Sequence, residues 1–326
     1  MKLIITQTFD DLESCHRDPD SLLKWPHIFM LPSWMRVWWN QFGDKQEYER
    51  YICTVMQGNH PSGSAPLMIK GETAEFIGGE DVCDYSDVIV APGKASEFCH
   101  ILLNHLRAQG IAYLDLKSLR PDSVAMRTLA TEAQHQGGEI FCEPVDVSSE
   151  MELPADWDAY LMRLKGKQRH EIRRKLRRLD EVGDFRLRVV RRVQEVEREL
   201  DCFFDLFGSN REDKAGFMAP RMKRYFRSLA NSMAHAGLLK LYFLDIDNRP
   251  AASAMCFDYD DTVYLYNSGY DKRYKYLSAG FLCKALSIKD SISAKKIRYD
   301  FLKGAEPYKQ RLGGKQFSVY HCRIKL

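Results

Sequence analysis

The chain has 326 residues, enough for two ordinary domains or one large one, and no segment is of low complexity. Hydrophobic residues make up 45% and charged residues 29%, which is the composition of a globular protein with a substantial core. The 48 basic and 45 acidic residues leave a net charge of +3, which excludes a partner selected by global charge alone. Any preference for an anionic partner must therefore come from a local cluster.

The first half of the chain alternates helices with short strands. Gly43, Gly110 and the pair Gly137-Gly138 end its three predicted helices. We expect helices at 32–43, 95–108 and 122–136, and strands at 51–55, 66–69, 75–77, 87–90, 112–116 and 140–147.

The second half begins near Ser148-Ser149-Glu150, which reads as a linker. Asp156 is a predicted N-cap for one long helix over 157–183. The later elements follow from apolar periodicity and turn residues. We expect strands at 185–190, 238–245, 251–259, 262–267, 297–302 and 319–324, and helices at 193–210, 220–236 and from Ser278 onward. The chain is thus predicted to be α+β, with mixed sheets flanked by helices and domains at 1–150 and 151–326.

The nine cysteines stand far apart without a Cys-x-x-Cys pair, and most lie among apolar residues. This pattern predicts reduced core residues and neither a metal site nor a disulfide framework. The opening MKLIITQTFDDLESC becomes polar too soon for a signal peptide. No run approaches the roughly 20 apolar residues needed to cross a bilayer. We therefore expect a cytoplasmic protein.

Ser278-Ala279-Gly280 opens a helix with small residues. Such a start presents free backbone N–H groups and the positive end of the helix dipole, which together favour a phosphate. The alternative is an ordinary N-capped helix. The strand that follows ends in YDFLKG, where Asp300 would be costly to bury unless it is paired. Two interpretations of Asp300 therefore stay open. It acts as a general base or orients an acceptor amine, or it forms a structural ion pair with Lys309 or Arg311.

A basic run covers 163–178, where Glu171 is the single acidic residue. Its apolar stripe faces the core, so the charges cover the other face. The run contains nine basic residues: Arg163, Lys165, Lys167, Arg169, Arg173, Arg174, Lys175, Arg177 and Arg178. Three interpretations stay open, namely a solvated face, contact with donor phosphates or an acidic acceptor, and contact with anionic lipid or nucleic acid.

The second half resembles the BioF2-like (CelD-type) members of the GCN5-related N-acetyltransferase (GNAT) superfamily, which are relatives of the FemAB peptidyltransferases. The resemblance is carried by three blocks, which are 157–178, Phe203 to Leu206 and the run LYNSGYD, YLSAG and YDFLKGAEPYKQRLG within 265–313. The first half is more weakly similar to the same family, in the segments PSWMRVWW and DYSDVIV. The resemblance implies two tandem GNAT-like domains in a FemAB-like arrangement, with the working site in the second and no cofactor in the first.

The resemblance also implies roles for residues near the second working site. Lys275-x-x-Ser278-x-Gly280 stands where the superfamily carries a (Gln/Arg)-x-x-Gly-x-(Gly/Ala) pyrophosphate loop, from which it departs at Lys275 and Ser278. The strand 262–267 would separate from 297–302 to admit the pantetheine arm, with the thioester at its end. The implied donor-binding residues are Asn267, Ser268, Gly269, Lys275, Leu277, Ser278, Ala279 and Gly280.

The remaining implied roles concern catalysis and the acceptor. Tyr308 matches a tyrosine that protonates the departing thiolate, and Glu306 is a second candidate base beside Asp300. Cys283 is expected to face the core, so an acyl-enzyme is not expected. His170 and His235 are read as structural. The implied substrate-binding residues are Lys167, Arg169, Arg173, Arg211, Lys214, Lys309 and Arg311, although Arg211 and Lys214 also fit a plain surface loop.

Three functions remain open from the sequence. The first is an N-acyltransferase that uses acetyl-CoA or another acyl-CoA, needs no metal and acts on a small-molecule amine such as an amino sugar or envelope precursor. The second is a FemAB-like transferase using aminoacyl-tRNA, and the third is a non-catalytic binding module. No DNA partner is expected, peripheral membrane contact stays open, and the acceptor, acyl length and oligomeric state are not fixed by the sequence.

Overall fold

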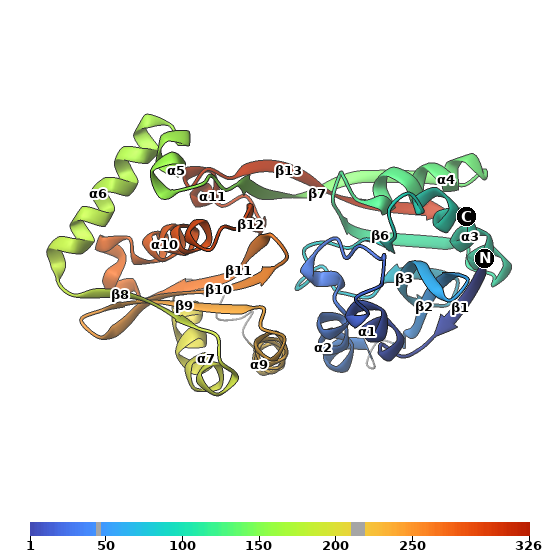
Figure 1. Ribbon diagram of the computed structural model, residues 1–326, viewed down its shortest axis with the longest axis horizontal. Helices are drawn as coiled ribbons and strands as arrows, with labels where there is room; N and C mark the ends of the chain where they lie inside the picture. The colour runs from blue at the N-terminus through green and yellow to red at the C-terminus, as the bar shows by residue number, and fades with distance from the viewer. Residues whose placement is uncertain (44–46, 210–218) are drawn as a thin grey trace. The chain divides into compact units, whose positions relative to one another are not determined.

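The computed structural model describes residues 1–43, 47–209 and 219–326, which form two compact units (Figure 1). One unit comprises Met1–Val147 with Phe317–Leu326, and the other comprises Ser148–Gln316. Each unit has a mixed sheet flanked by helices, so the predicted α+β class is confirmed. The chain divides close to the predicted boundary at 150/151, but its last ten residues return to the first unit.

The sheet of the first unit places the C-terminal strand beside β6. Its strand order is β1 (Lys2–Thr6), β2 (Glu49–Gln57), β3 (His60–Lys70), β4 (Thr73–Phe76), β6 (Tyr113–Leu119) and β13 (Lys315–Lys325), with β5 (Ile89–Val90) beside β3. The helices are α1 (Asp10–Arg17), α2 (Pro32–Phe42), α3 (Ala95–Ala108) and α4 (Ala130–His135), with short turns η1 (Ile28–Met30) and η3 (Ala125–Leu129). Phe98, Leu102 and Leu106 of α3 belong to the same buried cluster as Leu114 and Leu116 of β6.

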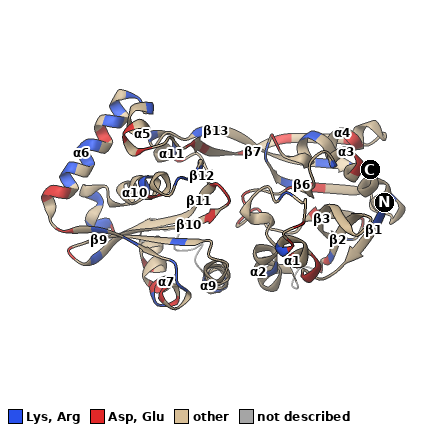
Figure 2. Ribbon diagram, in the orientation of Figure 1, with Lys and Arg blue, Asp and Glu red and all other residues tan. Residues whose placement is uncertain are grey.

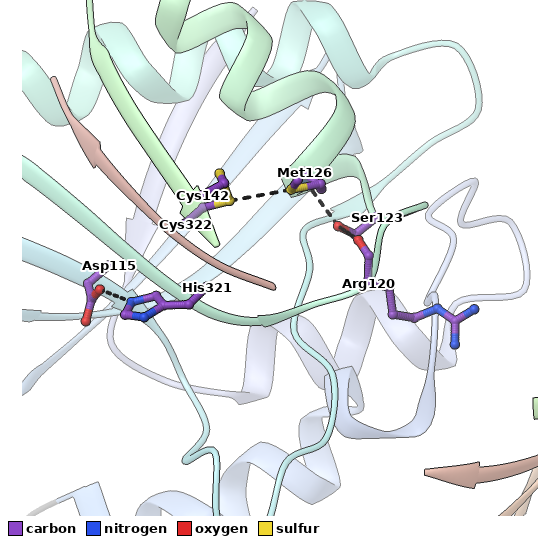
Figure 3. Close-up of a disulfide and its surroundings, with 7 residues drawn as sticks. All are labelled: Asp115, Arg120, Ser123, Met126, Cys142, His321 and Cys322. Carbon is purple, nitrogen blue, oxygen red and sulfur yellow. Dashed lines mark hydrogen bonds and ion pairs between the residues drawn. A yellow bond between two sulfur atoms is a disulfide. The ribbon is translucent and has the colours of Figure 1, made fainter. Parts of the chain in front are cut away.

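The expectation that all cysteines are reduced is wrong for two of them. Cys142 on β7 (Glu139–Glu152) and Cys322 on β13 form a disulfide within the first unit, with their Cα atoms 4.1 Å apart (Figure 3). Met126 contacts this bridge, because its Sδ lies 3.4 Å from Cys322 Sγ. The two cysteines are 180 residues apart in sequence, so no local spacing could indicate the pairing. The prediction of a cytoplasmic protein rested partly on reduced cysteines and stays a prediction.

The second unit carries a six-stranded run of sheet. Its order is β7, β12 (Arg298–Lys303), β11 (Thr262–Tyr270), β10 (Arg249–Tyr259), β9 (Leu239–Ile246) and β8 (Phe185–Val190). Its helices are α5 (Trp157–Arg163), α6 (Gly166–Val182), α7 (Val193–Gly208), α9 (Pro220–His235), α10 (Ala279–Ser293) and α11 (Pro307–Arg311), with a short turn η4 (Lys272–Leu277) before α10.

Consecutive residues of β11 show that α7 and α10 cover opposite faces of this sheet. A Cβ atom at Gly269 would lie 2.3 Å from the backbone of Leu206 in α7. The next residue, Tyr270, packs its ring against Gly280 of α10. Side chains of neighbouring strand residues point to opposite faces. Figure 1 shows the same arrangement, with α10 on one side of β9 to β11 and α7 and α9 on the other.

Gly269→Ala is expected to destabilise the protein by about 2–3 kcal/mol, because the added methyl group must displace the backbone of α7. Gly208→Ala is the matched control, since nothing lies within 4 Å of its added Cβ and alanine favours a helix. Urea denaturation of both variants checks this. Equal stabilities for the two would contradict the close contact between β11 and α7.

Two local expectations are wrong. The predicted linker Ser148-Ser149-Glu150 is part of β7, where both serines are fully buried and pair with β12. The predicted helix over 157–183 is two helices, because Leu164 is extended and buried and a break follows it before Gly166. The N-cap prediction is confirmed, since Asp156 Oδ1 accepts a hydrogen bond from Ala159 N at 2.8 Å. Tertiary pairing and burial outweigh local composition at both places.

No helix among the described residues is long and apolar enough to cross a membrane. In the same part of the chain, no group of three or more His, Cys, Asp and Glu side chains is arranged to hold a metal ion.

Candidate active site

The strands β11 and β12 separate within the second unit. They pair in parallel at three positions, Thr262–Arg298, Val263–Tyr299 and Tyr264–Asp300. Beyond Tyr264, β11 continues beside β10 as far as Tyr270. The separation follows the predicted pattern, although it begins before Asn267. Strands that stop pairing turn backbone N–H and C=O groups toward the space between them, and an extended ligand can bond to such groups.

A β-bulge lies where the two strands part. The register of β11 against β10 shifts between Leu265 and Asn267, so Tyr266 is the additional residue. A bulge bends its strand and is common beside active sites. Of the predicted thioester-binding residues, Gly269 faces α7, and strand alternation puts Ser268 on the α10 face. The close packing of α7 against β11 therefore explains why residue 269 is a glycine.

The N-terminus of α10 differs from the predicted cap. Ser278 has left-handed backbone angles, φ 59° and ψ 38°, and its side chain makes no capping hydrogen bond. Its hydroxyl oxygen instead accepts a hydrogen bond from Lys175 Nζ at 2.9 Å. The first turn of an α-helix leaves its N–H groups without intrahelical partners. Lys175 therefore lies where those groups converge.

The other residues of the predicted phosphate loop are placed by packing. Leu277, Ala279 and Gly280 are buried, and Lys275 is exposed. A Cβ atom at Gly280 would lie 2.7 Å from Cδ1 of Tyr270. Glycine at 280 is therefore explained by the ring of Tyr270, and substitution there would test packing rather than phosphate binding.

A basic pocket of about 630 Å³ lies between α6 and α11. Its lining is mostly charged: Lys167, Gln168, His170, Glu171, Arg174 and Arg311. Glu171 forms ion pairs with Arg311 and, at 3.3 Å, with Lys175. The same two cations contact the first turn of α10, because Lys175 Nζ and the Arg311 guanidinium lie 4.5 and 5.0 Å from the centre of the Phe281 ring. The pocket and the start of α10 are thus joined by shared side chains.

The structure selects different basic residues of α6 from those named by the resemblance. Lys167 lines the pocket, whereas Arg169 and Arg173 do not, and Arg173 is exposed. Two residues that were not predicted to bind substrate do face this region: Arg174 lines the pocket, and Lys175 bonds to Ser278 at the start of α10. The helical period could have indicated this, because Glu171, Lys175 and Arg178 flank the buried Ile172 and Leu179 at steps of three and four residues. Figure 2 shows Lys and Arg along most of α6.

The electrostatics at Lys175 favour an anion. A cation near the N-terminus of a helix is unfavourable, because the helix dipole is positive there. Burial lowers the pKa of Lys175, although the charge of Glu171 opposes this. Burial alone would raise the pKa of Glu171, but the hydrogen bond from Arg311 and the charge of Lys175 outweigh it and hold that pKa below its ordinary value. A bound phosphate would offset the cost of placing Lys175 at this position.

Asp300 is almost fully buried, with 1% of its surface exposed. Tyr299 bonds to Ser287 of α10 at 2.7 Å, so strand alternation places Asp300 on the α7 face. Its Oδ1 accepts a hydrogen bond from Leu302 N at 2.7 Å, within a β-bulge against β7. Glu150 on β7 is its cross-strand partner. Two carboxylates therefore share this face, and the sequence analysis had assigned Glu150 to a linker.

Lys309 and Arg311 do not supply the ion pair expected as the alternative for Asp300. Lys309 is buried, and its Nζ donates to the carbonyl oxygens of Leu302, Lys303 and Gly304. It also pairs with Glu306 at 3.0 Å. Arg311 pairs with Glu171. Lys309 and Glu306 thus hold the turn after β12.

Tyr308 is half-buried on α11 and lies on the α10 side of the sheet. The ammonium of Lys284, a buried residue of α10, lies 4.6 Å from the centre of its ring and donates to Gly280 O at 2.9 Å. Burial, and then the charge of Glu306, raises the pKa of Tyr308. The phenol therefore keeps its proton at neutral pH and can donate it. The sequence did not indicate a role for Lys284, because its only distinctive feature there is that its neighbours are apolar.

Cys283 is fully buried in α10, as predicted, and burial raises the pKa of its thiol to about 12. A thiol in this state is a poor nucleophile at neutral pH. Arg211 and Lys214 lie outside the described residues.

Comparison with known proteins finds a family match within the second unit. The acetyltransferase (GNAT) domain family matches residues 166–310. No curated protein matches the chain in sequence. The fold resembles the crystal structure of FemX, with a TM-score of 0.67 and 10% identity over 99% of this chain and 97% of that one.

Two further solved structures share the fold. A conserved protein of unknown function from Bacteroides thetaiotaomicron has a TM-score of 0.58 and 11% identity over 100% of both chains. The C-terminal domain of a putative lysylphosphatidylglycerol synthetase from Agrobacterium fabrum has a TM-score of 0.55 and 12% identity over 81% of each chain. The predicted tandem GNAT-like, FemAB-like fold is confirmed.

Proposed function

We propose that the protein is an acyl-CoA-dependent N-acyltransferase whose working site is in the second unit, because the acetyltransferase (GNAT) domain family matches residues 166–310 within that unit. The observation that carries the proposal is Lys175, held 2.9 Å from Ser278 at the positive end of α10. Arg311 contacts the same first turn. This arrangement suits the diphosphate of a nucleotide-bearing donor.

The separated strands β11 and β12 provide a place for the pantetheine arm of the donor. The pantetheine arm of acyl-CoA is an extended chain with amide groups, and it can pair with β11 beyond Tyr264 as a strand would. Backbone N–H groups near the bulge at Tyr266 then stabilise the oxyanion of the tetrahedral intermediate.

The catalytic step uses groups on the two faces of the sheet. Asp300 takes a proton from the acceptor ammonium, directly or through a water molecule, and the neutral amine attacks the thioester carbonyl. The carbon–sulfur bond breaks, the amide forms, and Tyr308 gives its proton to the departing thiolate. Glu306 forms an ion pair with Lys309, and its role is to stabilise the turn that precedes Tyr308.

The acceptor is a small-molecule primary amine in this proposal. Asp300 and Glu150 lie next to each other on the α7 face, and two carboxylates favour a cationic group. An amino sugar or envelope precursor meets this requirement. Transfer from aminoacyl-tRNA is the second candidate, because the basic pocket beside α6 also suits the phosphates of RNA.

Calorimetric titration tests the donor. We expect saturable binding of acetyl-CoA and of free CoA, with a longer acyl-CoA reporting the room available between β11 and β12. No binding of any of these compounds would contradict the proposal. Salt-sensitive binding of an aminoacyl-tRNA, without binding of acetyl-CoA, would establish the second candidate instead.

A further inference from the structure

The pocket between α6 and α11 is larger than a contact for one phosphate requires. Its volume of about 630 Å³ lies within the roughly 300–1,000 Å³ typical of small-molecule sites. Its residues come from two elements, the basic helix α6 and the C-terminal end of α11.

The pocket has an excess of positive charge. Glu171 is its single carboxylate, and Arg311 and Lys175 already share it. Within residues 1–43, 47–209 and 219–326, neither Lys167 nor Arg174 has an ion pair. Cations gathered without counter-charges repel one another, and an anionic ligand removes that repulsion.

The pocket adjoins the phosphate-binding start of α10 without coinciding with it. Lys175 contacts Ser278, and Glu171 connects Lys175 to the pocket. Lys167 and Arg174 line the pocket but make no contact with the first turn of α10 among the interactions of the described residues. Two anionic groups of one ligand could thus be bound on either side of Glu171.

We propose that this pocket binds a second phosphate group of the donor, with Arg174 and Lys167 as its specificity-determining cations. The inference rests on the proposed function, in which the diphosphate of acyl-CoA lies at α10. The ribose of CoA carries a 3′-phosphate close to that diphosphate, so one nucleotide reaches both places. The enzyme therefore discriminates against donors that lack the 3′-phosphate.

The test is a titration of two donors, acetyl-CoA and its 3′-dephospho analogue, against three proteins. Wild type is expected to bind the dephospho analogue about tenfold to a hundredfold more weakly, which is the contribution of one charge-assisted contact. Arg174→Met is expected to weaken acetyl-CoA binding and to reduce the difference between the two donors, because Lys167 is then the only one of the two proposed cations that remains. A double-mutant cycle of this form isolates the contact between Arg174 and the phosphate.

Arg177→Met is the matched control, because Arg177 is exposed on the same helix and pairs with Glu181 rather than lining the pocket. It should bind both donors as wild type does, and thermal unfolding checks that both variants are folded. Equal binding of the two donors by wild type, or full discrimination by Arg174→Met, would overturn the inference while leaving the proposed function intact. Binding of neither donor would overturn the proposed function and this inference with it.

Discussion

Lys175→Glu is expected to weaken acetyl-CoA binding by about a hundredfold or more, because it replaces a cation at the proposed phosphate site with an anion. Lys175 Nζ is held by Ser278 at the first turn of α10, where the helix dipole and free N–H groups favour negative charge. Charge-assisted hydrogen bonds to phosphate are worth about 1.5–3 kcal/mol, and the reversal adds repulsion to their loss. Calorimetric titration at constant ionic strength measures the change.

Arg169→Glu is the matched control for that variant. It makes the same change of charge on the same helix, but Arg169 does not line the pocket and has no ion pair among the described residues. Long-range electrostatics alone would weaken binding equally in both variants, whereas a local phosphate site predicts a large effect at Lys175 and a small one at Arg169. If Lys175→Glu bound acetyl-CoA as tightly as wild type, Lys175 would not bind the donor phosphates, and the main argument for the proposed function would be lost.

Lys309→Met is expected to lower the free energy of unfolding by about 3–5 kcal/mol. The buried ammonium donates to three carbonyl oxygens and pairs with Glu306, and a thioether can do neither. Those carbonyls belong to a turn in which Leu302 and Gly304 have positive φ angles, 62° and 111°. Without Lys309, the turn that positions Tyr308 loses its main polar support.

Chemical denaturation of Lys309→Met compared with Lys315→Met provides the measurement. Lys315 is exposed at the start of β13, and its substitution should change stability by less than about 0.5 kcal/mol. The sequence analysis named Lys309 as a substrate-binding residue. A Lys309→Met variant of normal stability but much reduced donor affinity would instead support a substrate-binding role for Lys309.

Several features of this protein could be derived from local sequence. Apolar periodicity located most helices and strands, and the predicted helix 95–108 has the bounds of α3. The small residues 278–280 marked the start of α10, and the Asp156 cap was correct. These features depend on neighbours within a few residues, which a sequence displays directly.

Local composition predicts the wrong structure at two places where tertiary pairing decides it. Ser148, Ser149 and Glu150 read as a linker, yet they form a buried part of β7 because β12 pairs with them. Leu164 lies inside the predicted helix 157–183, yet in the structure it is extended and buried between α5 and α6. In both cases the burial provided by a distant segment outweighs local propensity.

The sequence by itself determined the α+β class, the family resemblance and the position at which α10 begins. Only the tertiary structure decided that Lys175 bonds to Ser278, that Glu150 lies beside Asp300, and that Cys142 meets Cys322. The physical reason is separation along the chain. These pairs are about 100 or more residues apart, and their contacts depend on which strands and helices come together rather than on any local pattern.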